Sequence, residues 1–275
     1  ATFGGGGHSR EILKSLGSEG RLVGFDRDID ARANIQNDER FQFAHHNYCY
    51  LNRFLKYFGH GQVDGVLADL GISSHQIDQE DRGFSIRFAE AMLDMRMDQD
   101  KEIHAGKILN EYDDFKLSKI FKDYGELKSA RSVSRRILTY RASRPISKAK
   151  DVFEALNGMV PKSKENRFFA QVFQAIRIEV NDEMESLKEF LVQAEKALRP
   201  GGRLVVLSYH SLEDRIVKRF VRSGFNKQND VLPDLAQKWS LKAINTKPIL
   251  PSDIEIEENS RARSAKLRIA EKVES

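Results

Sequence analysis

Glycine residues near the start of the chain form a pattern that suits a ligand of the nucleotide type. Four consecutive glycines, Gly4 to Gly7, precede His8, and the residues from Ser9 onward have helical spacing. Glycine lets the backbone turn sharply and approach a ligand without an intervening Cβ, and a following helix presents free N–H groups. Since many glycine-rich loops are ordinary turns, this loop predicts a cofactor pocket only together with other residues.

Two aspartates supply the additional signal. Asp26 ends the apolar run of residues 21–25, and Asp69 ends the apolar run that begins at Val63. The carboxyl ends of parallel strands share one edge of a sheet, where open α/β folds bind their ligands. An acid about 20 residues beyond a glycine loop is placed to accept both ribose hydroxyls of a nucleoside cofactor. The loop and the two aspartates therefore predict a nucleoside site.

The spacing of the glycines distinguishes between cofactors. The dinucleotide motif G-x-G-x-x-G requires a third glycine at position 9 or 10, where this chain has Ser9 and Arg10. S-adenosylmethionine has no pyrophosphate and does not need that glycine. The pattern thus favours a methyl donor over NAD, and an NAD enzyme stays a minor alternative.

Alternating strands and helices must position these residues. Up to residue 69 the pattern predicts a parallel sheet with helices on both faces, with strands at 21–25, 41–44 and 63–69 and helices at 9–16, 29–35 and 51–58. Residues 71–100 have no clean period, residues 108–160 are helical throughout, and further helices are expected at 169–180 and 187–198. Strands are expected again at 203–208 and 265–269, as further members of the sheet.

We therefore expect a core of residues 1–100 and 181–275 with a helical insertion at 101–180. Because a glycine loop of this kind normally follows a strand, we also expect a first strand before Ala1 that is absent here.

Composition narrows the class of protein. The 275 residues, 40% of them hydrophobic, suffice for one core and a smaller second unit. No apolar run is long enough to span a bilayer, and no signal peptide is recognisable. Cys49 is the only cysteine, which fits a reducing cytoplasm, and no Cys/His cluster has the spacing of a metal site. The sequence leaves open whether the protein forms a homodimer.

Basic residues are clustered although the net charge is only +4. Eight lie between Lys128 and Lys150 with no acidic residue among them, and shorter runs begin at Arg215 and Arg261. One such run is usually a solvated helix face, but three favour a polyanionic partner. The candidate RNA-binding residues are Arg131, Arg135, Arg136, Arg141, Arg144, Arg215, Lys218, Arg261 and Arg263.

Nine segments, in order along almost the whole chain, carry a specific resemblance: Thr2–Ser9, Phe25–Asp28, Val63–Ser74, Arg82–Ser85, Leu93–Asp98, Phe173–Asn181, Pro200–Leu204, Ser208–Phe220 and Arg261–Arg268. They resemble the bacterial small-subunit ribosomal RNA cytosine-N4 methyltransferase family (RsmH, formerly MraW), and the Ser-x-His-Ser-Leu-Glu-Asp-Arg run from Ser208 is the most specific of them. The chain departs from the family at Gly5, where many members have arginine, and at residues 88–92, which replace an Asp-Gly-Pro turn.

The resemblance implies a class I S-adenosylmethionine-dependent methyltransferase, an α/β Rossmann-like fold with an α-helical insertion. It implies methylation of the exocyclic amine of a cytidine in small-subunit (16S) ribosomal RNA. The family's cofactor residues map onto Gly6, Gly7, His8, Asp26, Tyr48, Asp69 and Gln76. Tyr48 stands where the family usually has phenylalanine.

The chemistry of such a reaction points to further residues. The exocyclic nitrogen of cytosine is a poor nucleophile because its lone pair is delocalised, so an acceptor for its N–H groups would assist attack. The candidate catalytic residues are Asp69, Ser208, His210 and Ser211. Asp69 could equally be a cofactor contact alone, and His210 could make a structural hydrogen bond. The Met95–Met97 stretch is either core packing or a lid over the site. As alternatives, the protein methylates DNA or another RNA, or is a non-catalytic nucleic-acid-binding module with a vestigial cofactor pocket.

Overall fold

The computed structural model describes residues 2–225 and 239–274. The chain forms two compact units, one of residues 1–71 and 184–275 and the other of residues 72–183. The sequence analysis placed the corresponding boundaries at residues 100/101 and 180/181. Each unit has a hydrophobic core of its own.

The first unit is built on two sheets. Strands β1 (Leu22–Asp26) and β2 (Phe41–His45) pair in parallel, and a four-stranded sheet has the order β3-β4-β6-β5. Its strands are β3 (Val63–Asp69), β4 (Leu198–Ser208), β5 (Leu241–Ala243) and β6 (Lys266–Lys272). Strands β3 and β4 are parallel, whereas β6 is antiparallel to both β4 and β5. The expected parallel pairing is confirmed for β1 with β2 and for β3 with β4, whereas β5 and β6 make the larger sheet a mixed one.

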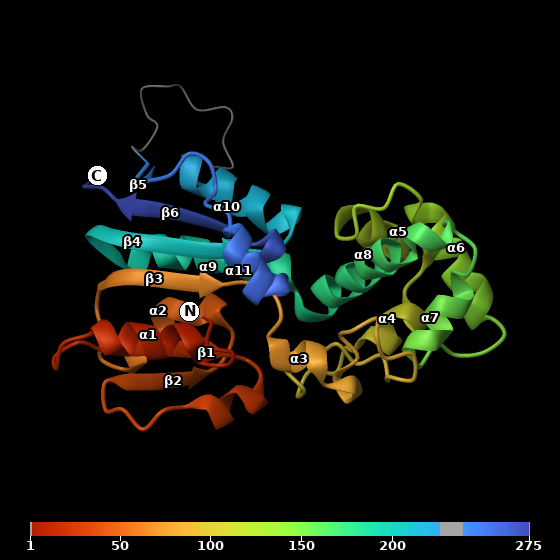
Figure 1. The fold of residues 1–275 in the computed structure, drawn as a ribbon, viewed down its shortest axis with the longest axis horizontal. Helices are drawn as coiled ribbons and strands as arrows, with labels where there is room; N and C mark the ends of the chain where they lie inside the picture. Colours follow the sequence, from red (N-terminus) through yellow and green to blue (C-terminus); the bar gives the residue numbers. More distant parts are fainter. Residues whose placement is uncertain (1, 226–238, 275) are drawn as a thin grey trace. The chain divides into compact units, whose positions relative to one another are not determined.

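Helices cover these strands. Helix α1 (Gly7–Ser15) crosses in front of the strands in Figure 1 and α9 (Glu183–Ala197) lies behind them. Phe190 and Leu191 of α9 are fully buried in one core cluster with Val66 of β3 and Phe220 of α10 (Ser211–Ser223). Further elements of this unit are η2 (Tyr48–Tyr50), α2 (Leu51–Tyr57), α11 (Asp253–Glu258) and η5 (Ser260–Ser264).

One expected α-helix has a different form. Residues Ile29–Asn34 make a 3₁₀ helix, η1, with the Asp28 side chain accepting a hydrogen bond from Asp30 N at its start. A segment of six residues gains few α-helical hydrogen bonds, so the tighter turn is a common outcome at this length.

The second unit is helical. It contains α3 (Ser74–Asp78), η3 (Glu80–Arg82), α4 (Ala105–Glu111), α5 (Asp114–Asp123), α6 (Ala130–Arg141), α7 (Ala149–Ala155) and α8 (Lys162–Asn181). Met95 is 0% and Met97 6% exposed within its core. The Asn181 side chain accepts from Met97 N at 2.8 Å and donates to Met95 O at 2.7 Å. Of the two readings of this stretch, core packing is the one that these contacts support.

Among residues 2–225 and 239–274, no helix is both long and apolar enough to cross a membrane.

Candidate active site

The glycine loop and Asp26 form one hydrogen-bonded unit at the end of β1. Asp26 Oδ2 accepts from Gly4 N at 2.8 Å, and Asp26 Oδ1 accepts from Asp28 N at 2.9 Å. Burial raises the pKa of the Asp26 carboxyl, and these two backbone donors oppose that rise. Each carboxylate oxygen keeps a lone pair, so Asp26 can still accept hydrogen bonds from a diol.

The loop glycines differ in what surrounds them. Gly6 precedes α1 with a φ of +72°, and a Cβ there would lie 3.2 Å from the Phe3 ring. By contrast, a Cβ on Gly5 or Gly7 would meet no described atom within 4 Å. Gly6 is thus required by the turn itself, whereas Gly7 borders open space at the start of a helix. The free space at Gly5 would accommodate the arginine that the family resemblance leads us to expect at this position.

Asp69 is held from three directions at the end of β3. Its backbone N–H donates to Thr2 Oγ1 at 2.7 Å, and its Oδ1 accepts from the Tyr209 hydroxyl at 2.7 Å. His8 Nε2 lies 3.4 Å from Asp69 Oδ2. Because Phe3 N also donates to Phe25 O of β1 at 2.8 Å, the dipeptide Thr2-Phe3 joins the ends of β1 and β3. The structure therefore brings together Asp26, the glycine loop, His8 and Asp69, as the sequence predicted.

The charge of Asp69 affects both of its side-chain partners. Hydrogen bonding to Asp69 raises the pKa of His8 above its ordinary value of 6.5. Burial, followed by the charge of Asp69, raises the pKa of the Tyr209 phenol. Tyr209 is consequently a neutral hydrogen-bond donor at physiological pH, and the carboxylate of Asp69 is its acceptor.

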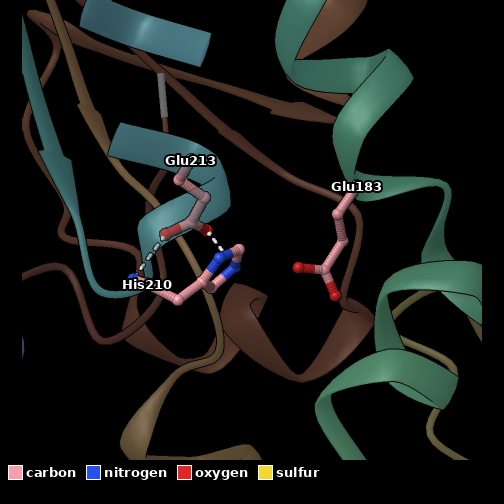
Figure 2. Close-up of side chains that lie close together, drawn as sticks. All are labelled: Glu183, His210 and Glu213. Carbon is pink, nitrogen blue, oxygen red and sulfur yellow. Dashed lines mark hydrogen bonds and ion pairs between the residues drawn. The ribbon is translucent and has the colours of Figure 1, made fainter. Parts of the chain in front are cut away.

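A compact turn links β4 to α10. Glu213 is buried, and its Oε2 accepts from Tyr209 N at 2.9 Å and from His210 N at 3.3 Å. His210 Nε2 lies 3.2 Å from Glu213 Oε1. Figure 2 shows the two side chains facing each other. Ser211 begins α10 and His210 precedes it as the N-cap, so these two predicted catalytic residues lie at the start of this helix. Ser208 lies deeper, at 2% exposure, and its hydroxyl donates to Lys266 O of β6 at 3.4 Å.

Comparison with known proteins identifies the family of this chain. The model of the MraW methylase family matches residues 1–273. The chain belongs to the MraW methylase family. It is 49% identical over 275 residues to a ribosomal RNA small subunit methyltransferase H of Christiangramia forsetii. Proteins with the same name from Flavobacterium johnsoniae and Parabacteroides distasonis are each 51% identical, over 274 and 276 residues. Each comparison covers 99% of this chain and 90% of the relative.

Membership in this methylase family settles several expectations. The fold is that of a class I methyltransferase with a mixed α/β core, the protein is a methyltransferase, and its methyl donor is S-adenosylmethionine. An NAD enzyme is therefore excluded, as the missing third glycine had indicated.

Two predicted cofactor residues have clear structural partners of their own. Tyr48 stacks edge-on against Phe190, with ring centroids 4.9 Å apart. Gln76 belongs to the helical unit and is 4% exposed. Its side chain completes a capping box at the start of α3, where Ser73 N donates to Gln76 Oε1 at 3.0 Å. These contacts do not test a role in cofactor binding.

Seven of the nine predicted RNA-binding residues form two exposed groups. Arg131, Arg135 and Arg136 are exposed on α6. Arg215, Lys218, Arg261 and Arg263 are exposed on α10 and η5. The other two are engaged within the helical unit: Arg141 donates to Leu109 O at 2.8 Å, and Arg144 pairs with Glu154 and lies 4.6 Å from the centre of the Tyr140 ring.

Sequence reasoning assigned no individual role to Tyr209, Thr2 or Glu213. All three make the hydrogen bonds that hold Asp69 or the turn after β4. A signal for Tyr209 existed, because it directly follows the strand that ends at Ser208 and lies within the most specific segment. Its contact with Asp69 depends on β3 and β4 being neighbours, which the local pattern does not reveal.

Proposed function

We propose that this protein transfers a methyl group from S-adenosylmethionine to the exocyclic N4 amine of a cytidine in small-subunit (16S) ribosomal RNA. The observation that carries the proposal is the carboxylate of Asp69, which Tyr209 and His8 contact on the strand edge that also holds the glycine loop and Asp26. The names of the relatives, each a ribosomal RNA small subunit methyltransferase H, support the substrate.

The residues of this edge fit the methyl donor. The open space beside Gly7 leaves room for a ligand at the start of α1, and Asp26 has lone pairs for ribose hydroxyls. We propose that Gly6, Gly7, His8, Asp26, Tyr48, Asp69 and Gln76 hold the cofactor. A sulfonium carries no phosphate, which suits a loop that lacks the third glycine.

The chemical step is a displacement. S-adenosylmethionine supplies an electrophilic methyl carbon on its sulfonium. The cytosine N4 lone pair forms the new N–C bond while the S–CH₃ bond breaks, and N4 then loses one proton. Asp69 accepts a hydrogen bond from the amine and receives this proton or passes it to water. Tyr209, by donating to Oδ1, fixes the carboxylate, so most of the acceleration is positioning of amine and acceptor.

The turn after β4 supplies the proposed contacts to the base. His210 and Ser211 lie at the start of α10, next to Tyr209 in the chain, and we assign them contact with the cytosine. The Ser208 hydroxyl is buried and donates to Lys266 O, so Ser208 acts by supporting the end of β4. Glu213 holds the turn through the backbone of Tyr209 and His210.

The exposed arginines extend the proposal to RNA binding. We propose that Arg131, Arg135 and Arg136, which are exposed on α6 of the helical unit, contact RNA phosphates. Arg215, Lys218, Arg261 and Arg263 form a second basic group on the core unit. We propose that the protein acts in the cytoplasm, where small ribosomal subunits lie.

The decisive experiment measures transfer of labelled methyl to small ribosomal subunits from cells that lack the modification, followed by nucleoside analysis. We expect label in N4-methylated cytidine, with fully modified subunits as the unlabelled control. Label in DNA or in free RNA, but not in subunits, would show that the substrate differs from the one proposed. Binding of S-adenosylhomocysteine in calorimetry without any transfer would favour a non-catalytic module.

A further inference from the structure

Helix α2 of the core unit has two opposite faces. Leu51 and Leu55 are each 4% exposed and belong to the core. Tyr50 is 41% and Tyr57 78% exposed, and the spacing of Tyr50, Phe54 and Tyr57 places them on one side of the helix. Two large aromatic side chains on the solvent face of a short helix do not contribute to the core, and such a patch commonly marks a binding surface.

The rings of this face are connected to one another. The His46 ring lies 4.6 Å from that of Tyr50 and 5.3 Å from that of Phe54, measured between centroids. The Phe54 ring lies 6.3 Å from that of Tyr57 and packs edge-on against buried Phe25 at 5.7 Å. The exposed rings therefore rest on a series of aromatic contacts that ends in the core, which restricts their motion before any ligand binds.

The chain segment that carries these rings has charged residues of one sign. From Phe41 to Val63 the chain contains Arg53, Lys56 and three histidines but no aspartate or glutamate. Arg53 and Lys56 are both exposed. Arg53 follows Tyr50 by three residues, so it shares the face of the two tyrosines, and Lys56 immediately precedes Tyr57. Aromatic rings between cations are the combination with which proteins bind single-stranded nucleic acid.

An unpaired RNA segment fits this face better than a duplex or a protein. Stacking requires exposed faces of bases, which a duplex buries within its helix. A protein partner that contacts only apolar surface would leave Arg53 and Lys56 without counter-charges, whereas phosphates supply them. Tyr50 ends η2 and Tyr57 ends α2, seven positions later, which at the helical rise is roughly 10 Å and room for two or three stacked nucleotides.

The position of this face relates it to the active-site edge. His45 at the end of β2 pairs in register with Asp26 of β1, and His46 follows it directly. The series of rings thus begins at the edge that carries Asp26 and continues along α2 to Tyr57. RNA bound here would lead away from the edge at which we place methyl transfer.

We propose that Tyr50, Arg53, Phe54 and Tyr57 form a stacking surface for an unpaired stretch of RNA. Bases stack on the two tyrosine rings, and Arg53 and Lys56 contact the adjoining phosphates. That this RNA is the ribosomal substrate rests on the proposed function, whereas the stacking chemistry does not.

Fluorescence anisotropy with a labelled single-stranded RNA 12-mer tests the surface. The double variant Tyr50→Leu/Tyr57→Leu keeps apolar side chains but removes the rings, and we expect its affinity for the 12-mer to fall about tenfold or more. Tyr50→Phe/Tyr57→Phe keeps the rings and should bind like the wild type. Affinity for a duplex of the same length should change in neither variant.

A matched control is available on the other unit. Phe115 of α5 is 77% exposed, so Phe115→Leu removes an equally exposed ring and should leave binding of the 12-mer unchanged. Equal affinity of the wild type and the double leucine variant would overturn the proposal, as would an equal loss in Phe115→Leu. If the double leucine variant fails to fold, weaker binding by Arg53→Glu and Lys56→Glu supports the surface, and unchanged binding rejects it.

The two proposals fail separately. If the wild type methylates subunits while the double leucine variant binds the 12-mer normally, only the stacking surface is wrong. If ring-dependent binding is found but subunits accept no methyl group, the surface stands and the proposed function is wrong.

Discussion

Tyr209 donates its hydroxyl to Asp69 Oδ1 at 2.7 Å although 140 positions separate the two residues in the chain. The contact joins the ends of two neighbouring parallel strands, since Asp69 is paired in register with Leu207. It fixes one carboxylate oxygen and leaves Oδ2 on the side of His8. Tyr209 thereby determines how Asp69 is oriented toward any amine that approaches this edge.

Replacing Tyr209 by phenylalanine tests this positioning role. A hydrogen bond to a charged group contributes roughly 1.5–3 kcal/mol, so we expect kcat to fall about tenfold or more while the KM for S-adenosylmethionine changes little. The His8 pKa, measured by NMR, should rise further because Asp69 loses a competing donor. A lower kcat with an unmoved His8 pKa would indicate a general structural defect.

Replacing Asp69 by asparagine separates its two possible roles. Asparagine keeps the shape but loses the charge and the basicity, so a proton acceptor should lose about 10²-fold or more in kcat at saturating S-adenosylmethionine. Calorimetry with S-adenosylhomocysteine gives the cofactor affinity independently. If kcat at saturation is unchanged and only the affinity falls, Asp69 is a cofactor contact.

The His8–Asp69 pair makes stability depend on pH. The pKa of His8 is raised above 6.5 in the folded protein. The ion pair therefore stabilises the folded state fully below about pH 6.5, and this stabilisation is lost as the pH rises through the raised pKa. Both side chains are partly exposed, so the effect should be less than about 1 kcal/mol. The free energy of unfolding of the wild type and of His8→Gln should therefore converge between pH 6 and pH 9. In an Asp69→Asn background the His8→Gln change should produce no such pH dependence.

Some parts of this edge were predictable from sequence and others were not. The apolar runs that end in Asp26 and Asp69 became β1 and β3 because strand ends can be recognised from a few consecutive residues. The hydrogen bonds of Asp69 to Thr2 and Tyr209 were not predicted, because they span 67 and 140 positions and depend on the order of the strands.

In the helical unit, too, some parts were predictable from sequence and others were not. Periodic residues predicted α5, α6 and α8, which have regular apolar faces. Leu93, Met95 and Met97 are buried although they lie in loop backbone, and the Asn181 side chain bonds to the backbone of Met95 and Met97. These apolar residues alternate with Asp94 and Arg96, a pattern that also suits a strand of the sheet, which is why the sequence could not assign the stretch to this unit.

The glycine loop offers a test with a built-in control. Gly7→Val places a branched side chain in space that is open in the structure, so stability should be retained while affinity for S-adenosylhomocysteine falls more than tenfold, measured by calorimetry. Gly5→Arg introduces the residue expected from the family resemblance and should bind like the wild type. Unchanged affinity in Gly7→Val would place the cofactor elsewhere.

Charge reversal on α6 tests the RNA-phosphate surface. Arg135 and Arg136 are exposed, and each phosphate contact that is lost should flatten the plot of log K against log salt by about 0.7–0.9. The variant Arg135→Glu/Arg136→Glu should therefore bind small-subunit RNA more weakly, with the difference largest at low salt. Lys162→Glu/Lys164→Glu reverses two exposed charges on α8 of the same unit and controls for net charge. If both variants show the same salt slope, the RNA responds to overall charge, and the residues of α6 are only a solvated helix face.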